Sequence, residues 1–355
     1  MIRNLRAALI LLLLGAVCSA CGAPEKPAQP PTSLIFYNWE GDLPQSVIDA
    51  YQAESGVQII YKVYEAQEDA LAELREGEAY DVVVMDSRFV PQLAAENLLA
   101  QLDYSRLPNY KNISPAFRDL LYDPGNVYSL PYNWGVTGLL VRTDHITQTI
   151  SSWNALWEPM FIDRVGIWQG QPREMTAMVL KALGYSANAE DPQQLAAARQ
   201  KLLALKPAVH FFEDYDLETA AEAFASGKVD LGVGYASDYL ACIEAGLPVA
   251  YIFPDEGALL WGDTFVIPAA SRRQAQAADF LNFLMRPEIS AQITNQNNFP
   301  TANVMATPLI NPQLVSNPVI FPPKEVIQAA EVILPLSAAA QAQYDAIWQE
   351  FLEAP

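Results

Sequence analysis

Aromatic and acidic side chains occur together where apolar, strand-like runs of this sequence end. In the stretch FYNWEGDLP, residues 36–44, Trp39 follows an apolar run and lies beside two acids, one of which is Asp42. Other strand-like runs end at or near residues of the same types, namely Asp86, Tyr235, Asp238, Trp261 and Asp263. In open α/β sheets, ligands bind beyond the carboxyl ends of the strands. These positions are therefore candidates for a binding site.

An aromatic face and a carboxylate together suit an amine that has a hydrocarbon stem. The ring attracts the ammonium group and covers the neighbouring methylene groups, and such a contact contributes roughly 0.5–2 kcal/mol. The carboxylate accepts a charge-assisted hydrogen bond from the same ammonium group. Because a buried carboxylate without a partner is costly, a cation that enters such a site stabilises it. The pattern therefore predicts a binding site for a cationic amine.

The charge of the chain favours cationic or neutral ligands. It has 41 acidic and 21 basic residues and a net charge of -20, so it repels nucleic acid and anionic membrane surfaces. Hydrophobic residues make up 51% and charged residues 17% of the chain, which excludes a disordered protein. The length of 355 residues indicates two lobes or domains.

The N-terminal residues 1–21 are expected to be a lipoprotein-type signal peptide. Two arginines precede the apolar run 7–14, which is too short to span a membrane. Cys21 follows small residues, as at a lipidation site, but Cys18 stands where such sites usually carry Leu. We expect export to the periplasm or another extracytoplasmic space. Lipidation of Cys21 would anchor the protein to a membrane surface, and the alternative is simple cleavage and release.

Strand-like and helix-like segments alternate after this region, which is typical of an α/β protein. Residues 22–33 are a Pro-rich tether, and globular patterning begins at Leu34. Cys242 is the only cysteine beyond the signal region, so no disulfide framework is expected. Strands are predicted at 33–38, 57–64, 80–86, 135–143, 164–169, 229–235 and 258–268. Helices are predicted at 45–56, 66–78, 173–185, 217–227, 272–287 and from about Lys324 onward.

Several blocks of the sequence resemble those of the periplasmic spermidine/putrescine-binding proteins, which serve ABC transporters. The blocks are FYNWEGDLP, YDVVVMDS, YSLPYNWGVTGLLV, SSWNALWEP, ALLWGDTFVIP and FPTAN. The resemblance extends from about Leu34 to the last residues. It implies an α/β, two-lobed periplasmic-binding-protein fold of type II, which closes on a polyamine in a cleft between the lobes. Lobe 1 would comprise residues 34–138 and 265–302, and lobe 2 residues 139–264 with the helical segment 303–355.

The same resemblance implies roles for individual residues. Trp39 matches an aromatic residue after the first strand, and Glu174 matches a carboxylate that receives a terminal amine. Trp261 and Asp263 match a ring-plus-acid pair of the second lobe. The full set of expected ligand-binding residues is Trp39, Asp42, Asp86, Glu174, Tyr235, Asp238, Trp261, Asp263 and Phe299.

The chain also departs from the family pattern. Asp86 and Arg88 stand where small polar or hydroxyl residues are usual, and Gln171 replaces an acid of the spermidine type. Asp42 replaces a ring, and Phe299 replaces a Tyr. Arg88 would oppose an amine unless it pairs with Asp86 or points outward. The altered pattern does not specify spermidine.

Structural roles remain open for several of these residues. Glu174 could simply begin a helix, where acids favour the helix dipole. Asp238 could cap the helix that follows it. Asp86 could end its strand in a turn or neutralise Arg88. Trp39 could be a core residue.

The function expected from these features is that of an exported, monomeric binding protein that hands a linear polyamine to an ABC-transporter permease. No cofactor, metal or catalytic step is expected. The two histidines lie in unrelated contexts, and no hydrolase motif or phosphate-binding loop occurs. A relative that binds a sugar or an amino-acid-like solute is the alternative, motivated by Arg88. A third possibility, an exported hydrolase, has no support in the sequence.

Overall fold

The structure is a computed structural model that describes residues 33–64, 66–213 and 219–355. Ser33–Pro355 form one compact unit. The expected signal peptide, the lipidation site at Cys21 and the tether up to residue 32 lie outside the described residues. Within the described ranges, none of the helices combines the length and the apolar character needed to cross a membrane.

The strands form one hydrogen-bonded path in the order β2-β1-β3-β9-β4-β7-β5-β6, with β10 paired to β9 and β8 paired to β4. Strands β1, β2 and β3 run parallel, as do β5, β6 and β7, whereas β9 and β4 pair antiparallel with their neighbours on this path. The strands are β1 Ser33–Asn38, β2 Gln58–Val63, β3 Val82–Asp86, β4 Ser129–Arg142, β5 Val165–Trp168, β6 Val209–Phe212, β7 Leu231–Gly234, β8 Val249–Ile252, β9 Leu259–Val266 and β10 Glu331–Val332.

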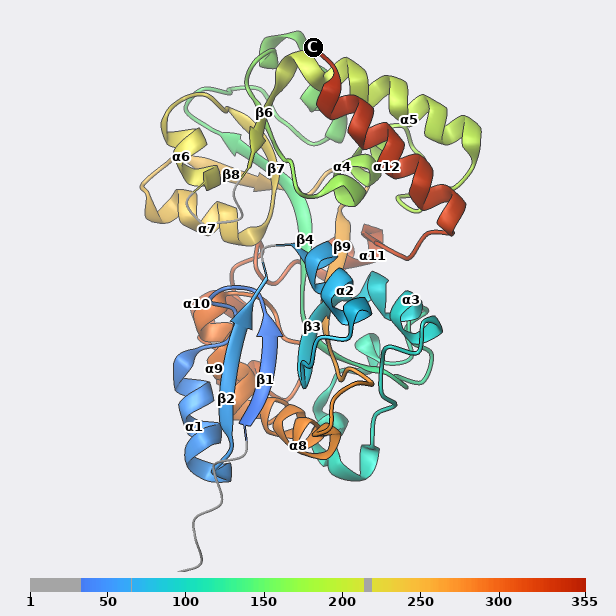
Figure 1. Cartoon of the computed structure of the whole chain (residues 1–355). Helices are drawn as coiled ribbons and strands as arrows, with labels where there is room; N and C mark the ends of the chain where they lie inside the picture. The colour runs from blue at the N-terminus through green and yellow to red at the C-terminus, as the bar shows by residue number, and fades with distance from the viewer. Residues whose placement is uncertain (1–32, 65, 214–218) are drawn as a thin grey trace, which may run out of the picture. The chain divides into compact units, whose positions relative to one another are not determined.

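Two of these strands connect the halves of the sheet. β4 is buried along its whole length; its first part pairs with β9 and its last part with β7 and β8. Figure 1 shows β4 and β9 running side by side between the half that holds β1–β3 and the half that holds β5–β8.

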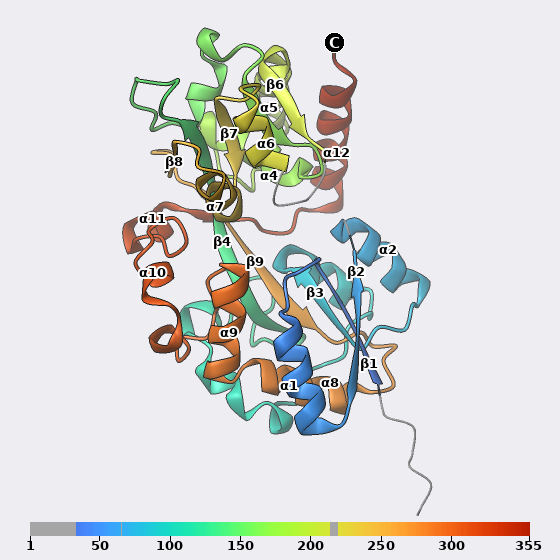
Figure 2. The same ribbon diagram turned by 90° about the vertical axis from the view of Figure 1, so that its left-hand side faces the viewer.

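Helices cover both faces of each half of the sheet. They are α1 Gln45–Ser55, α2 Gln67–Glu76, α3 Val90–Ala95, α4 Pro172–Ala182, α5 Pro192–Leu205, α6 Thr219–Ala225, α7 Ala236–Glu244, α8 Gln274–Leu284, α9 Pro287–Asn297, α10 Pro312–Val315, α11 Lys324–Ala329 and α12 Ala338–Glu353. Figure 2 shows α1, α8 and α9 on one side of β1–β3 and α2 on the other.

Alternation of side chains along the strands explains this layering. In β3, Val82 and Val84 pack into the cluster that contains residues of α1, α8 and α9, whereas Val83 and Met85 pack into the cluster that contains residues of α2 and α3. Successive strand residues point to opposite faces, so an unbroken apolar run fits a strand that helices cover on both faces. In the other half, α4, α5 and α12 share one hydrophobic cluster, and α6 and α7 share another.

The segment after residue 302 packs in two places. Ala306 and Ile310 form a cluster with Ala291 of α9, whereas Tyr344 and Trp348 of α12 pack into the cluster of α4 and α5. The exact residues that separate the two lobes stay a prediction.

Candidate functional site

Two acids that the sequence singles out lie opposite each other at adjacent strands. β3 and β9 are antiparallel neighbours, and their register pairs Asp86 with Asp263. Asp263 is 9% exposed, and burial, together with the charges of Asp86 and Asp42, holds its pKa well above the usual range. Among the described residues, its carboxylate accepts one hydrogen bond, from Gln67 Nε2 at 3.5 Å. A cation close to Asp263 would therefore relieve a substantial electrostatic cost.

Gln67 is part of the site although its residue type and position gave no signal in the sequence. It is the first residue of α2 and is buried. Its Nε2 donates to Asp263, while its Oε1 accepts a hydrogen bond from the backbone N–H of Asp86 at 2.6 Å. This one amide therefore joins the backbone at the end of β3 to the carboxylate of Asp263 within β9.

Glu174 is a buried carboxylate in the first turn of α4. The Tyr235 hydroxyl donates to its Oε2 at 2.6 Å, and Thr137 Oγ1 lies 3.5 Å from both of its oxygens. Burial raises the pKa of Glu174 to about 7, and the nearby charge of Asp86 raises it too, whereas Tyr235 and Arg88 lower it. Glu174 thus begins a helix and is also a buried acid with a raised pKa, a combination that is frequent at functional sites.

Three of the predicted aromatic residues form one connected group. The Trp261 ring meets the Tyr235 ring edge to face at 5.9 Å between centroids, and it meets the Phe299 ring in the same way at 5.5 Å. Because the Tyr235 hydroxyl also donates to Glu174, the ring group is in direct contact with this acid. The structure thus brings together Tyr235, Trp261, Phe299, Glu174 and, two residues from Trp261 on the same strand, Asp263.

Gly135 determines where the Trp261 ring can lie. It is paired with Trp261 across β4 and β9, and a Cβ atom at Gly135 would lie 2.2 Å from a carbon of the indole. Any side chain here would therefore displace the ring. This glycine lies inside the block YSLPYNWGVTGLLV, but the sequence alone does not show that a ring packs on it.

Trp39 packs against Tyr64 at the end of β1. Its ring is half-buried and packs 4.6 Å from the ring of Tyr64. The pKa of Tyr64 is raised well above its usual value by burial, and also by the charges of Asp263 and Asp42. Trp39 therefore packs against two hydrophobic clusters of the core, and its neighbour Tyr64 lies within the field of the acids.

Asp42 is buried. Its carboxylate accepts hydrogen bonds from the amides of Asn38 at 2.8 Å, Asn297 at 2.9 Å and Asn133 at 3.2 Å. Burial raises its pKa above the ordinary value, and these amides oppose that rise. Asp42 adds to the negative field at Asp263, but its own oxygens are already well occupied.

Asp238 has the geometry of a helix cap. Its Oδ2 accepts the backbone N–H of Tyr235 at 2.7 Å, as part of a capping box at the start of α7. The side chain is buried, and burial raises its pKa to about 7, whereas hydrogen bonds from Tyr235 and Trp168 lower it. The carboxylate of Asp238 thus interacts with the N-terminus of its own helix and with Trp168.

Arg88 pairs with the acids around it. Its Nε lies 3.6 Å from Asp86 Oδ2, and its Nη2 lies 3.6 Å from Glu68 Oε1. Asp86 also accepts the backbone N–H of Arg88 at 2.9 Å, at the start of a short 3-10 helix, Ser87–Phe89. Asp86 therefore both ends its strand in a turn and neutralises Arg88, which were the two structural roles left open for it.

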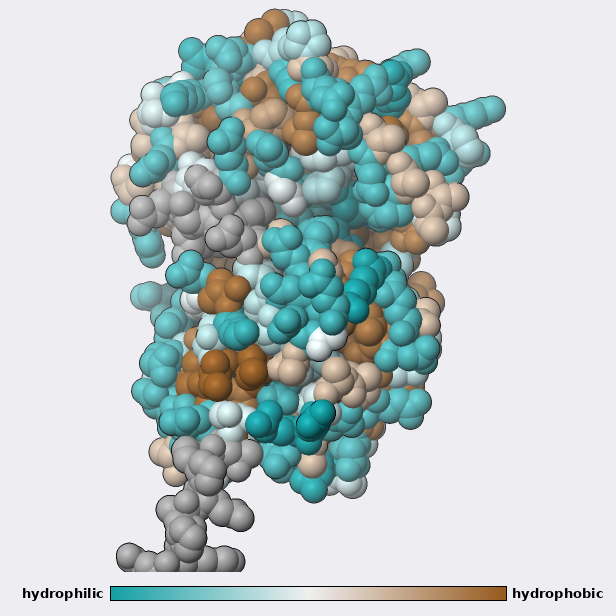
Figure 3. Space-filling view, viewed as in Figure 1, coloured by the Kyte–Doolittle hydropathy of each residue, from teal (hydrophilic) through white to brown (hydrophobic). Residues whose placement is uncertain are grey.

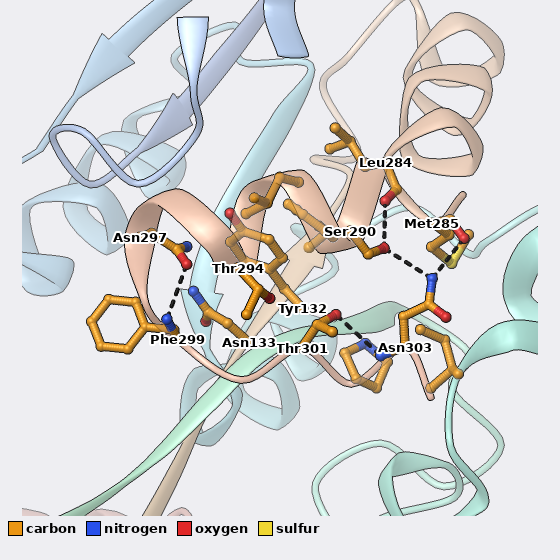
Figure 4. Close-up of a pocket in the computed structure, with 14 residues that line it drawn as sticks. Tyr132, Asn133, Leu284, Met285, Ser290, Thr294, Asn297, Phe299, Thr301 and Asn303 are labelled. Atoms are coloured by element: carbon orange, nitrogen blue, oxygen red, sulfur yellow. Dashed lines mark hydrogen bonds between the residues drawn. The ribbon is translucent and has the colours of Figure 1, made fainter. Parts of the chain in front are cut away.

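The segment that carries Phe299 is fixed by side-chain hydrogen bonds (Figure 4). The backbone N–H of Phe299 donates to Asn297 Oδ1 at 3.0 Å, and Asn303 Nδ2 donates to Ser290 Oγ at 2.9 Å. A cavity of about 10 Å³ lies behind this segment, lined in part by Tyr132 and Thr294. That volume suits about one water molecule, so the cavity is too small for an amine ligand.

A wider hollow of about 390 Å³ lies elsewhere on the surface, and its lining contains none of the predicted binding residues. It is lined by Tyr37, Val63, Tyr64, Asp69, Ala72, Glu73 and Glu76. On the face shown in Figure 3, hydrophilic side chains cover most of the surface, and an apolar patch lies over the region of β1 and β2. Among the described residues, no three His, Cys, Asp or Glu side chains are arranged to hold a metal ion.

The comparison with known proteins assigns the family. A model of the family described as bacterial extracellular solute-binding protein matches residues 46–322. The chain belongs to this family. A Salmonella typhimurium member named spermidine/putrescine-binding periplasmic protein is 32% identical, over 90% of this chain and 91% of that protein. The family is extracytoplasmic, which agrees with the export expected from the sequence.

Solved structures of solute-binding proteins confirm the fold class. A structure from Listeria monocytogenes superposes with a TM-score of 0.83 at 28% identity, covering 90% of this chain and 99% of that one. The spermidine/putrescine ABC transporter substrate-binding protein of Streptococcus pneumoniae superposes with a TM-score of 0.79 at 26% identity, covering 91% of this chain and 99% of that one. The predicted α/β, two-lobed binding-protein fold and the predicted family are therefore both confirmed.

Proposed function

We propose that this solute-binding protein captures a linear polyamine outside the cytoplasm and delivers it to the permease of an ABC importer. The observation that carries the proposal is the connected group of rings and buried acids around Asp263, Glu174 and Trp261. Relatives over most of the chain are named for spermidine and putrescine binding, and one structural relative is named as the substrate-binding protein of an ABC transporter. In this role the protein acts as a monomer, anchored through a lipidated Cys21.

The chemistry of the group favours an amine. Asp263 and Glu174 are buried carboxylates without an ion-pair partner among the described residues. An ammonium group would satisfy each with charge-assisted hydrogen bonds. The rings of Trp261, Tyr235 and Phe299 provide faces for the hydrocarbon stem and for cation–π contact. Contact with both lobes would favour the closed state, because the ligand reaches both sets of residues only when the lobes are shut.

The same group disfavours an anionic ligand. Arg88, which motivated that alternative, has Asp86 and Glu68 within 3.6 Å and is also attracted by Glu174. A carboxylate placed beside Arg88 would meet these acids, which repel it. Experiment must then distinguish a polyamine from a sugar-like solute as the ligand.

The proposal is tested by replacing Asp263 with Asn and titrating putrescine by calorimetry. The substitution keeps the size of the side chain and removes its charge, so we expect amine affinity to fall by roughly 1.5–3 kcal/mol, the value of a hydrogen bond to a charged group. The melting temperature without ligand should not fall, because ionised Asp263 is unfavourable in the folded state.

Asp279→Asn is the matched control. Asp279 is half exposed and pairs with Arg106 on the surface, and its replacement makes the same change in net charge. Its amine affinity should equal that of the unmodified protein. Equal putrescine affinity in both variants would remove Asp263 from the site, and failure of the unmodified protein to bind any amine would refute the proposed function.

A further inference from the structure

Arg88 carries the same sign of charge as the proposed ligand and lies among the acids expected to hold it. Its side chain is 11% exposed, and its guanidinium carbon lies 4.7 Å from the centre of the Phe89 ring. It lies in the short 3-10 helix after β3, next to Asp86, and its charge also acts on Glu174 of α4, which belongs to the half of the sheet that holds β5–β8. The charge of Arg88 therefore acts on acids of both halves.

The guanidinium is not fully paired. Nε and Nη2 face Asp86 and Glu68 at 3.6 Å, which is a long contact for an ion pair. Nη1 is buried and has no hydrogen-bond partner among the described residues. A guanidinium held in this way supplies a fixed positive charge inside the group of acids.

The buried and half-buried acids of the site, Asp42, Asp86, Asp263 and Glu174, differ in whether other groups of the protein already satisfy them. Asp42 is occupied by three amides, and Asp86 is paired with Arg88. Within the part of the chain that the structure describes, Asp263 and Glu174 have only neutral donors, namely Gln67, Tyr235 and Thr137. The carboxylates of Asp263 and Glu174 are thus available for two ammonium groups of a ligand. The guanidinium of Arg88 supplies the third positive charge.

We propose that Arg88 replaces one ammonium group of a longer polyamine, so that the site selects ligands with two positive charges over ligands with three. This inference rests on the proposed polyamine function and specifies its substrate class as diamines. A triamine would place a third positive charge near the guanidinium, where the two like charges repel each other in a poorly solvated setting. A diamine avoids this repulsion and still satisfies Asp263 and Glu174.

The test compares two ligands of equal length and different charge. Spermidine and 1,8-diaminooctane have the same number of chain atoms between their ends, but only spermidine has a charged central nitrogen. We expect the unmodified protein to bind 1,8-diaminooctane more tightly than spermidine in calorimetric titrations. In Arg88→Gln the ratio of the two dissociation constants should shift about tenfold in favour of spermidine, because the fixed charge is gone.

Two further variants separate charge from shape. Arg88→Lys keeps the charge and should keep the preference for the diamine. Arg75→Gln removes an arginine that pairs with Glu96 on the surface, so it makes the same change in net charge and should leave the ratio unchanged.

Several outcomes overturn the inference. These are an unmodified protein that prefers spermidine, an unchanged ratio in Arg88→Gln, an equal shift in Arg75→Gln, and a shift in Arg88→Lys as large as in Arg88→Gln. A preference of the unmodified protein for spermidine overturns the inference even if Arg88→Gln does not fold. An unmodified protein that binds no amine would instead refute the proposed function, and this inference with it.

Discussion

Glu174 is a buried carboxylate whose pKa, about 7, lies in the range where the protein would work. An ammonium ligand binds its ionised form, so binding below this pKa must first displace a proton. We expect putrescine affinity to rise between about pH 6 and about pH 8, where the amine itself keeps its charge. Calorimetry in buffers of different ionisation enthalpy measures the proton released. An affinity independent of pH across this range would contradict the role of Glu174.

The raised pKa of Glu174 also determines how the free energy of unfolding changes with pH. The pKa of Glu174 rises from 4.5 to about 7 on folding, so the folded state holds more protons than the unfolded state between these values. Its contribution to the free energy of unfolding therefore falls as the pH rises from about 4.5 to about 7, by roughly 3 kcal/mol in total. Glu174→Gln should remove this part of the pH dependence of melting. Glu54→Gln, at an exposed ion pair with Arg286, should leave it in place.

At the level of residues, the sequence was informative about rings and acids and uninformative about their partners. The pair Trp261 and Asp263, two residues apart, could be recognised because both are in one short block at a strand. Gln67 could not, since its two hydrogen bonds reach residues 19 and 196 positions away. The burial of Asp42 could not be predicted for the same reason, because two of its amide donors come from the distant elements β4 and α9.

At the level of elements, the pairing of β4 and β9 places the Trp261 ring directly over Gly135. We expect Gly135→Ala to displace the ring, lower amine affinity at least about tenfold and lower stability by about 1–3 kcal/mol, the usual cost of overpacking. Gly262→Ala is the control on the adjacent strand, since its Cβ would meet no atom closer than 3.7 Å. Putrescine titration and thermal melting of both variants check this. Equal behaviour of the two variants would show that the close contact at Gly135 does not matter.

The strand and helix pattern of the sequence predicted most elements, and proline accounts for two differences. β4 was expected to begin at residue 135, but it begins at Ser129, because a register shift between Pro131 and Trp134 lets the strand continue past the proline. The helix 272–287 was expected to end at Pro287, which instead begins α9, since the first turn of a helix accepts proline. α5, β6 and β8 were also not predicted, and the C-terminal helical region is divided into α11 and α12 by β10.

For the whole molecule, the excess of acidic over basic residues predicts a salt effect on binding. The net charge is -20, and a cationic ligand is attracted both by this field and by the local acids. Raising the salt concentration from about 0.01 M to about 1 M shortens the screening length from roughly 30 Å to roughly 3 Å. Putrescine should therefore bind more slowly and more weakly at high salt, as measured by calorimetry and stopped-flow mixing. A salt-independent affinity, with binding of glucose instead, would favour the sugar-binding alternative.

The crossing of β4 and β9 also bears on how the chain folds as it emerges. β3 has β1 on one side and β9 on the other, and β9 is made more than 170 residues later in the sequence. Until then, the apolar edge of β3 has no neighbour and is open to wrong pairing. In a chain delivered from its N-terminus, this edge therefore stays unpaired until nearly three quarters of the chain is available.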